Sequence, residues 1–427
     1  MVTEEPPPKL PRDRHLFGPG PKRILALDGG GVRGAITVAF LERIEKLLAE
    51  YHGKDARLCD WFDLVGGTST GSIIAGALAL GYRAEQVRDF YLRLAPNAFE
   101  RALWHVPYIQ SKFRSHGLRG EIEKVVGDRT LDSSDLITGL GIFAKRMDTG
   151  SPWILSNNPR APYWDDKPDH IGNRHYKLAT LVRASTAAPH FFEPEILEII
   201  TEAEIMRIAR GNQPTSEQAG QPRGATVDSS THGIFVDGGM SPHGNPALGL
   251  FQMTQFKPFG ICWPTGTDRL TVVSVGTGTY RPRLSFEKLI LARFLRLGFK
   301  ALLSLMHDAE QLVLAQMQWM GDTLTPWIIN SEIGALPDDA PPGGKYFRFL
   351  RYDVRLERNW LESKLGIKRT QHEVERLRPM DRPSIVHDLY EIAKVAAEQQ
   401  VKEEHWKALL SPSANDESFA RMRSEPL

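Results

Sequence analysis

Ser69 lies in a glycine-flanked segment whose composition suits a nucleophile. Gly67-Thr68-Ser69-Thr70-Gly71 follows the apolar run 61–65 and precedes the apolar run 72–80. This order predicts a strand, a sharp turn and a helix, with glycines where a larger side chain would clash. Backbone N–H groups at a helix N-terminus also favour negative charge beside the serine. The pattern indicates a serine nucleophile, and an ordinary turn is the alternative because glycine and serine are common in loops.

Two other strand ends carry residues that could complete an ester-cleaving site. The segment Asp28-Gly29-Gly30-Gly31-Val32-Arg33-Gly34, here called the glycine loop, follows the apolar run 24–27, and Asp237-Gly238-Gly239 follows the run 233–236. Ester hydrolysis by serine needs an activated hydroxyl, a proton acceptor and donors for the oxyanion. We expect Ser69, Asp237 and the amides of the glycine loop to supply them. The three strand ends should meet at the carboxyl edge of a parallel sheet.

A dinucleotide site is the alternative interpretation of the glycine loop. Gly29, Gly31 and Gly34 satisfy G-x-G-x-x-G. However, the second predicted strand leads to the Ser69 turn and not to the acidic residue that binds a ribose. The chain contains no G-x-x-x-x-G-K-[ST] segment, and its thirteen histidines form no H-E-x-x-H pair. We therefore expect no metal and no other cofactor.

Composition restricts the classes of partner. The 427 residues are 41% hydrophobic and 25% charged, with a formal net charge of +1, so no global field points to a nucleic acid polymer. Two cysteines and the absence of a signal-like apolar run suggest a cytoplasmic protein. No uncharged apolar stretch reaches the ~20 residues that span a bilayer. Any membrane contact would therefore be peripheral.

The order of apolar segments predicts an α/β protein. Two strand-turn-helix units fill the first 80 residues, and the run 270–275 suits a buried parallel strand. From residue 286 the pattern is mainly helical, apart from a strand-like piece at 345–354. We divide the chain into a flexible proline-rich leader, a catalytic domain with a polar insertion, a helical C-terminal part packed on that domain, and a flexible tail. These span 1–21, 22–285 (insertion 201–233), 286–410 and 411–427.

The ordered motifs resemble the patatin-like phospholipases and lipid acyl hydrolases. The family's D-G-G-G-x-R-G is similar to residues 28–34, its G-T-S-x-G to 67–71 and its D-G-G/A to 237–239. Its A-S-x-A-A-P segment stands at 184–189, and its strand ending in G-T-G at 272–278. The resemblance covers roughly residues 22–280. It implies a three-layer α/β/α sandwich with a mostly parallel central sheet, here with a helical C-terminal extension.

The resemblance also implies site roles. Ser69 would be the nucleophile and Asp237 its base, forming a dyad with no histidine, and Gly29, Gly30 and Gly31 would form the oxyanion hole. Arg33 would stabilise the loop or bind a phosphate, and the reaction would need no metal. We expect His190 and His243 to pack or to line a cleft. The supporting glycines would be Gly34, Gly67, Gly71, Gly238 and Gly239.

The implied function is a serine hydrolase that releases fatty acids from membrane phospholipids or glycolipids. One alternative is a phospholipase effector of bacterial phage defence, gated by a small-molecule activator such as a cyclic nucleotide. Another is a lipid-binding or storage protein without catalysis. The aromatics of 98–118 could form a lid or belong to the core, and the basic helix 286–305 could lie on a membrane, although packing against the sheet is favoured.

Overall fold

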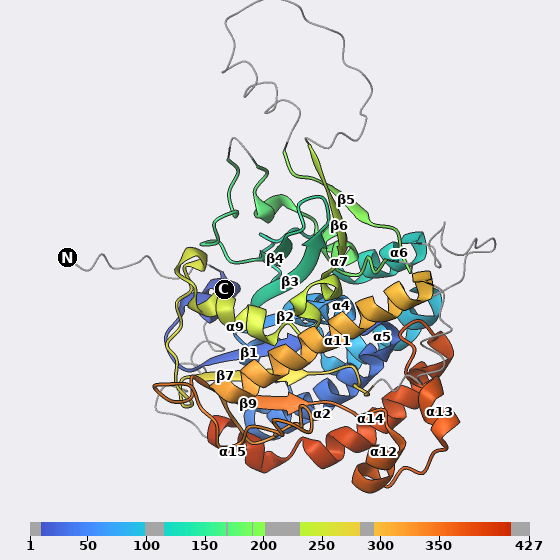
Figure 1. The fold of residues 1–427 in the computed structure, drawn as a ribbon. Coiled ribbons are helices and arrows are strands. Elements are labelled where there is room, and N and C mark those ends of the chain that lie inside the picture. The colour runs from blue at the N-terminus through green and yellow to red at the C-terminus, as the bar shows by residue number, and fades with distance from the viewer. Residues whose placement is uncertain are drawn as a thin grey trace, which may run out of the picture.

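A nine-stranded sheet forms the centre of the molecule (Figure 1). The computed structural model describes residues 10–98, 115–167, 170–189, 191–200, 231–281 and 294–410. The strands are β1 (Lys22–Leu27), β2 (Leu64–Thr68), β3 (Gly139–Arg146), β4 (Pro152–Ser156), β5 (Glu195–Glu198), β6 (His232–Asp237), β7 (Leu270–Val275), β8 (Gly321–Thr323) and β9 (Phe347–Tyr352). Their order is β5-β6-β3-β2-β1-β7-β9-β8, and β4 also pairs with β3.

The sheet is mostly parallel, as predicted, but the strand before Asp237 is not. The pairs β1–β2, β1–β7, β2–β3, β7–β9 and β8–β9 are parallel. Strand β6 runs antiparallel to β3 and to β5. The expectation of three parallel strand ends is therefore wrong for Asp237. Asp237 pairs with Ala144, next to Phe143, which pairs with Thr68 at the end of β2. It reaches the same edge from the opposite direction.

Helices cover both faces of the sheet. Alternate residues of β1 enter different apolar cores, Leu25 and Leu27 on one face and Ile24 and Ala26 on the other. The first core contains residues of α2, α4–α7, α14 and α15, and the second contains residues of α1, α9 and α11. The molecule is therefore a three-layer α/β/α sandwich. The helices so far named are α1 (Pro11–Phe17), α2 (Gly34–His52), α4 (Thr70–Ala79), α5 (Ala84–Ala98), α6 (Ser115–Val126), α7 (Leu178–Ser185), α9 (Ala247–Gln255), α11 (Phe294–Met320), α14 (Val386–Gln400) and α15 (Glu403–Leu410).

The C-terminal part both extends the sheet and covers it. The predicted strand-like piece at 345–354 is β9, which lies beside β7. Short helices α12 (Arg358–Leu365) and α13 (Gln371–Arg376) then lead to α14, which packs along α2 (Figure 1). The remaining short helix of the N-terminal half is α3 (Leu58–Trp61). Residues far beyond the motif-bearing region thus complete the central layer.

The N-terminal segment is ordered further than expected. A flexible leader was predicted over 1–21, but residues 11–17 form α1, whose Leu16 is fully buried. The Trp263 indole donates a 2.7 Å hydrogen bond to the Leu16 carbonyl, so this helix is tied to the second core. The expected tail lies outside the described residues, and so does most of the polar insertion. The aromatic residues of 98–118 lie outside them as well.

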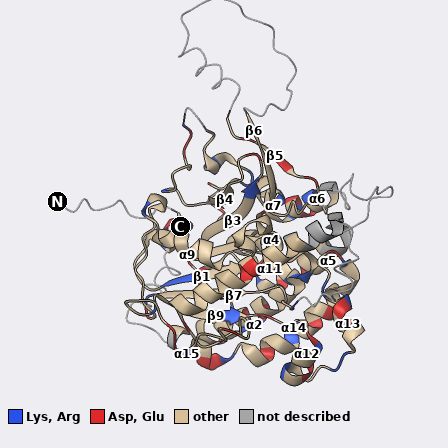
Figure 2. Cartoon of the chain, viewed as in Figure 1, with Lys and Arg blue, Asp and Glu red and all other residues tan. Residues whose placement is uncertain are grey.

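Charged residues of both signs lie on the side of the molecule drawn in Figure 2. Figure 2 shows acidic and basic residues interspersed over the visible helices. Within the described ranges, no helix combines the length and the apolar character that crossing a bilayer requires.

Candidate active site

Ser69 occupies a strained turn between β2 and α4. Its backbone has φ 53° and ψ −125°, a conformation that non-glycine residues seldom adopt. The turn leaves no space beside it: a Cβ on Gly67 would lie 2.1 Å from the carbonyl carbon of Gly71. A Cβ on Gly71 would lie 2.1 Å from the Leu27 oxygen. The two glycines are thus required by close backbone contact, and the serine stands at the helix N-terminus as predicted.

Hydrogen bonds hold the Ser69 backbone on both sides. Its N–H donates to the Ser185 hydroxyl at 2.9 Å, and that hydroxyl donates to the Phe143 carbonyl at 2.6 Å. The Ser72 hydroxyl donates to the Ser69 carbonyl at 2.6 Å. Such fixed partners can maintain an unfavourable backbone conformation. They also give a structural role to the 184–189 segment, because Ser185 links the turn to β3.

Asp237 lies close to Ser69. The carboxylate is 6% exposed, interacts with the Ser69 side chain, and accepts a 2.7 Å bond from the Gly239 N–H. Burial raises the pKa of Asp237 to about 6, while these two hydrogen bonds and the positive charge of Arg183 oppose the rise. A Cβ on Gly238 would lie 2.3 Å from the Phe143 oxygen. The carboxylate is therefore fixed, largely dry and more basic than usual.

The glycine loop lies against this pair with its carbonyls already bonded. The Thr277 hydroxyl donates to the Gly29 oxygen at 2.8 Å, and the Thr70 hydroxyl donates to the Gly31 oxygen at 2.8 Å. A Cβ on Gly29 would lie 3.3 Å from the Cβ of Ser69, so the loop passes directly beside the serine. The loop is therefore anchored by β7 and by α4, the helix that Ser69 begins.

The amides of the glycine loop are not equivalent. The Gly29 N–H donates to the Gly244 carbonyl at 3.0 Å, so this amide is already used. Within the described residues, no acceptor bonds the amides of Gly30 and Gly31. Gly31 has φ +57°, and a Cβ there would lie 2.2 Å from the Met380 oxygen. Unbonded neighbouring amides can bind an anion, so Gly30 and Gly31 suit an oxyanion hole better than Gly29.

Arg33 is a buried cation at the end of this loop. Its side chain is 8% exposed, its Nε has no hydrogen-bond partner, and it forms no ion pair among the described residues. Its guanidinium carbon lies 5.9 Å from the centre of the Tyr280 ring. Next to it, a Cβ on Gly34 would lie 2.1 Å from the Cγ2 of Thr70. The guanidinium is therefore available for an anionic ligand.

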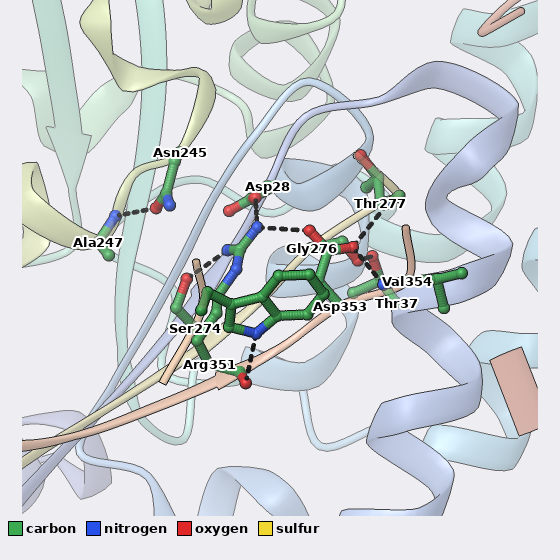
Figure 3. Close-up of polar contacts among 12 residues, drawn as sticks. Asp28, Thr37, Asn245, Ala247, Ser274, Gly276, Thr277, Arg351, Asp353 and Val354 are labelled. Atoms are coloured by element: carbon green, nitrogen blue, oxygen red, sulfur yellow. Dashed lines mark hydrogen bonds and ion pairs between the residues drawn. The ribbon is translucent and has the colours of Figure 1, made fainter. Parts of the chain in front are cut away.

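A buried ion-pair network supports the start of the glycine loop (Figure 3). Arg351 donates to Asp28 at 2.6 Å, to Asp353 at 2.8 Å and to the Ser274 hydroxyl at 2.7 Å. These residues follow or belong to three adjacent strands, β1, β7 and β9. Burial raises the pKa of Asp28 to about 6 in spite of Arg351. This network was not predicted from the sequence, although Arg351 and Asp353, two positions apart at the end of an apolar strand, are a usable signal.

Helix α11 covers the residues that follow Asp237. A Cβ on Gly239 would lie 3.5 Å from the Cε of Met306, and one on Gly244 would lie 3.2 Å from a carboxylate oxygen of Glu310. Burial and the nearby Asp28 charge raise the pKa of Glu310 to about 7. The side of α11 that faces the site therefore carries an apolar residue and a carboxyl group that titrates near neutrality.

The side chain of His243 packs against an aromatic ring. The His243 ring lies 4.8 Å from that of Phe143, and burial lowers its pKa to about 4, as a packed neutral imidazole would show. His190 lies outside the described residues. Across the described ranges, no group of three or more metal-binding side chains occurs.

Comparison with known proteins identifies the family. The family model described as "Patatin-like phospholipase" matches residues 25–251. The chain belongs to the patatin-like phospholipase family. A "cUMP-AMP-activated phospholipase" of Escherichia coli is 33% identical over 200 residues, 45% of this chain and 56% of that protein. "Patatin-like protein 1" of Arabidopsis thaliana is 28% identical over 277 residues, 60% of this patatin-like chain and 58% of the plant protein.

Two further matches cover 40% and 91% of this chain. A "cGAMP-activated phospholipase" of Escherichia coli (strain TW11681) is 33% identical over 177 residues, 40% of this chain and 48% of that protein. The structure of human GIVD cytosolic phospholipase A2 covers 91% of this chain and 59% of the human chain, with a TM-score of 0.38 and 10% identity. The patatin-like chain spans about half the length of the curated relatives it matches.

Proposed function

We propose that this protein is a serine lipid acyl hydrolase that releases fatty acids from phospholipids or glycolipids. The observation that carries the proposal is the contact between Ser69 and the buried Asp237, beside the unbonded amides of Gly30 and Gly31. A nucleophile, its base and anion donors are the three components that ester hydrolysis requires. The family membership favours lipid esters as the substrate class.

The chemistry follows from these positions. The Ser69 Oγ attacks the acyl carbonyl carbon while its proton passes to Asp237, and the Gly30 and Gly31 amides bind the resulting oxyanion. Collapse of the tetrahedral intermediate breaks the ester bond, and Asp237 gives the proton to the departing alcohol. Water, deprotonated in the same way, then attacks the acyl-enzyme. Fatty acid leaves and the Ser69 hydroxyl is restored.

Product analysis tests this proposal directly. The protein should release free fatty acid and the matching lysolipid from vesicles of mixed phospholipids, as measured by mass spectrometry. The same assay with galactolipid vesicles identifies the preferred head group. A protein that binds these vesicles but never releases fatty acid would match the lipid-binding alternative and contradict hydrolysis.

The activity should depend on pH through Asp237. A general base must be ionised, and the pKa of Asp237 is raised to about 6. We therefore expect kcat/KM to fall about tenfold for each pH unit below roughly 6, well above the ordinary range of an aspartate. A soluble fluorogenic ester measures this without effects of lipid packing, and unfolding curves at each pH exclude acid denaturation. Constant activity down to pH 4.5 would contradict the role of Asp237 as the base.

Arg33 should contribute to phosphate recognition. Its buried guanidinium forms no ion pair with a carboxylate in the described ranges, and a planar fork of donors fits a phosphate oxygen pair. We expect Arg33→Met to lower kcat/KM for a phospholipid roughly 10- to 100-fold, and to lower it much less for an uncharged short-chain ester. Equal losses on both substrates would instead indicate that Arg33 stabilises the loop. The Arg33→Lys variant keeps the positive charge but not the planar guanidinium, so its activity shows which of the two the phosphate requires.

A gated phospholipase is the second candidate function. Two of the relatives carry names that describe activation by cGAMP or by cUMP-AMP. In this chain, α11 lies against Gly239 and Gly244, immediately after the proposed base, so a shift of this helix would change the site. Activity that appears only when a cyclic dinucleotide is added would support gating. Full activity of the purified protein alone would contradict it.

A further inference from the structure

A pocket lies outside the Ser69–Asp237 site. Its volume is about 320 Å³, which falls in the range of roughly 300–1,000 Å³ typical of small-ligand sites. Four segments line it: the chain after β7, the middle of α11, the segment after β8 and the chain after β9. The residues that matter most to its chemistry are Arg281, His307, Asp308, Gln311, Arg355 and Glu357.

Two arginines give this pocket the character of an anion site. Neither Arg281 nor Arg355 forms an ion pair with a carboxylate in the described part of the chain. Arg355 donates to the Ile328 carbonyl, and its guanidinium carbon lies 5.1 Å from the centre of the Trp327 ring. Burial and the charge of Arg281 lower the pKa of Arg355, while the nearby carboxylates of Glu357 and Asp353 raise it, so the repulsion between the two cations is only partly relieved. A phosphate between them would relieve that repulsion.

The same pocket requires a hydrogen-bond donor from its ligand. The Oε1 of Gln311 is buried without a hydrogen-bond partner, which is costly for an amide oxygen. Glu357 also lines the pocket, and its carboxylate accepts a 2.9 Å bond from the Arg281 N–H. Asp308 adds a further exposed acceptor. An anion alone would leave the buried Gln311 Oε1 unmatched, whereas a phosphate ester with hydroxyl or amino groups could donate to it.

We propose that this pocket binds a phosphate ester, with its phosphate between Arg281 and Arg355 and a ligand O–H or N–H donated to Gln311. The pocket adjoins the catalytic region through two elements. Tyr280 lines the pocket and contacts Arg33, and His307 precedes Glu310 by one turn of α11. The ligand would be either a free nucleotide that acts as an activator or the head group of a phospholipid. A regulatory role rests on the gated phospholipase proposed above, whereas the binding does not.

Calorimetry on the Ser69→Ala protein tests the binding without hydrolysis. The probes are cGAMP and glycerophosphoethanolamine, which separate a nucleotide from a lipid head group. We expect one of them to bind with a Kd below 1 mM, and Arg281→Ala or Arg355→Ala to weaken binding about tenfold or more. Gln311→Met, which keeps the side-chain length, should weaken it roughly fivefold. The matched control is Arg358→Ala, an exposed arginine three positions beyond Arg355, which should bind like the parent.

Each outcome of this experiment either supports or contradicts ligand binding in the pocket. Preferential binding of cGAMP assigns the site to an activator, and preferential binding of glycerophosphoethanolamine assigns it to the head group of the substrate. If neither probe binds, the proposal is overturned. The proposal is also overturned if Arg281→Ala and Gln311→Met leave the binding unchanged. Neither of these two side chains forms an ion pair in the described structure. Because Ser69→Ala is used throughout, failure of lipid hydrolysis would not affect these results.

Discussion

Replacing Ser69 with alanine is expected to reduce fatty acid release from phospholipid vesicles by at least about 10⁴-fold. The change removes the only atom that can form the acyl-enzyme in the proposed mechanism, while the backbone bonds from Ser72 and to Ser185 stay available. Alanine in the strained turn should cost little more than serine, because both carry a Cβ. Labelling by a fluorophosphonate probe should disappear in parallel, which distinguishes loss of the nucleophile from loss of substrate binding.

Asp237→Asn is the matched test of the base. The amide keeps the size of the side chain and can still accept from the Gly239 N–H, but it cannot take a proton. We expect a loss of about 10³- to 10⁴-fold with an unchanged unfolding temperature. His243→Gln is the control, since the His243 ring packs against Phe143. If His243→Gln lost as much activity as Ser69→Ala, a histidine-dependent mechanism would replace the dyad.

Replacing Arg351 with leucine should lower the free energy of unfolding by about 3–5 kcal/mol. Arg351 is 3% exposed and carries the only guanidinium among the described residues that pairs with both Asp28 and Asp353. Its loss would leave two buried carboxyl groups without their ion-pair partner, which is costly away from water. Urea denaturation followed by tryptophan fluorescence measures the change.

Two further variants make that result specific. Arg358→Leu alters an exposed arginine and should change stability by less than about 0.5 kcal/mol. The triple variant Asp28→Asn, Arg351→Leu, Asp353→Asn removes all three charges and should recover part of the loss, because a neutral polar cluster costs less than an unpaired carboxylate. A loss below about 1 kcal/mol in Arg351→Leu would show that water reaches the network and that the pair is weak.

The Arg351 network also bears on the division of the chain. Asp28 opens the glycine loop, while its partner lies 323 positions later, a hundred residues beyond the end of the family match at residue 251. The C-terminal part therefore supplies an ion-pair partner as well as strand β9. A shortened chain that ended near residue 285 would expose the β7 edge and leave Asp28 without its cation.

Local motifs were sufficient to predict much of the fold and to propose the members of the candidate site. Gly67 is required by a contact with Gly71 in the same turn and Gly71 by a contact with Leu27 of β1, and the G-x-S-x-G spacing alone indicated both glycines. Apolar periodicity likewise located the helix that is α2 and the strand that is β7, because each has a continuous buried face. Asp237 was found from its glycine neighbours, although the direction of its strand was not.

The remaining features depend on contacts that leave little local trace. Strand direction is decided by pairing, and the register that places Asp237 beside Ala144 is not encoded within 233–239. The Gly29 amide differs from its neighbours only because the Gly244 carbonyl, more than 200 positions later, bonds it. Helix α1 was predicted as part of a leader because the preceding segment is rich in proline, whereas Leu16 is buried by packing against residues far along the chain, including Trp263.

The antiparallel pair β5–β6 has a consequence for protein engineering. The chain leaves this pair after Glu198 and returns at His232, and these two residues face each other at one end. Asp237 lies five positions further along β6, roughly 17 Å away at the usual rise of a strand. A fluorescent domain or affinity tag introduced between these anchor points would therefore be held at a distance from the serine. Lineages could vary the same segment in length while the chemistry stayed constant.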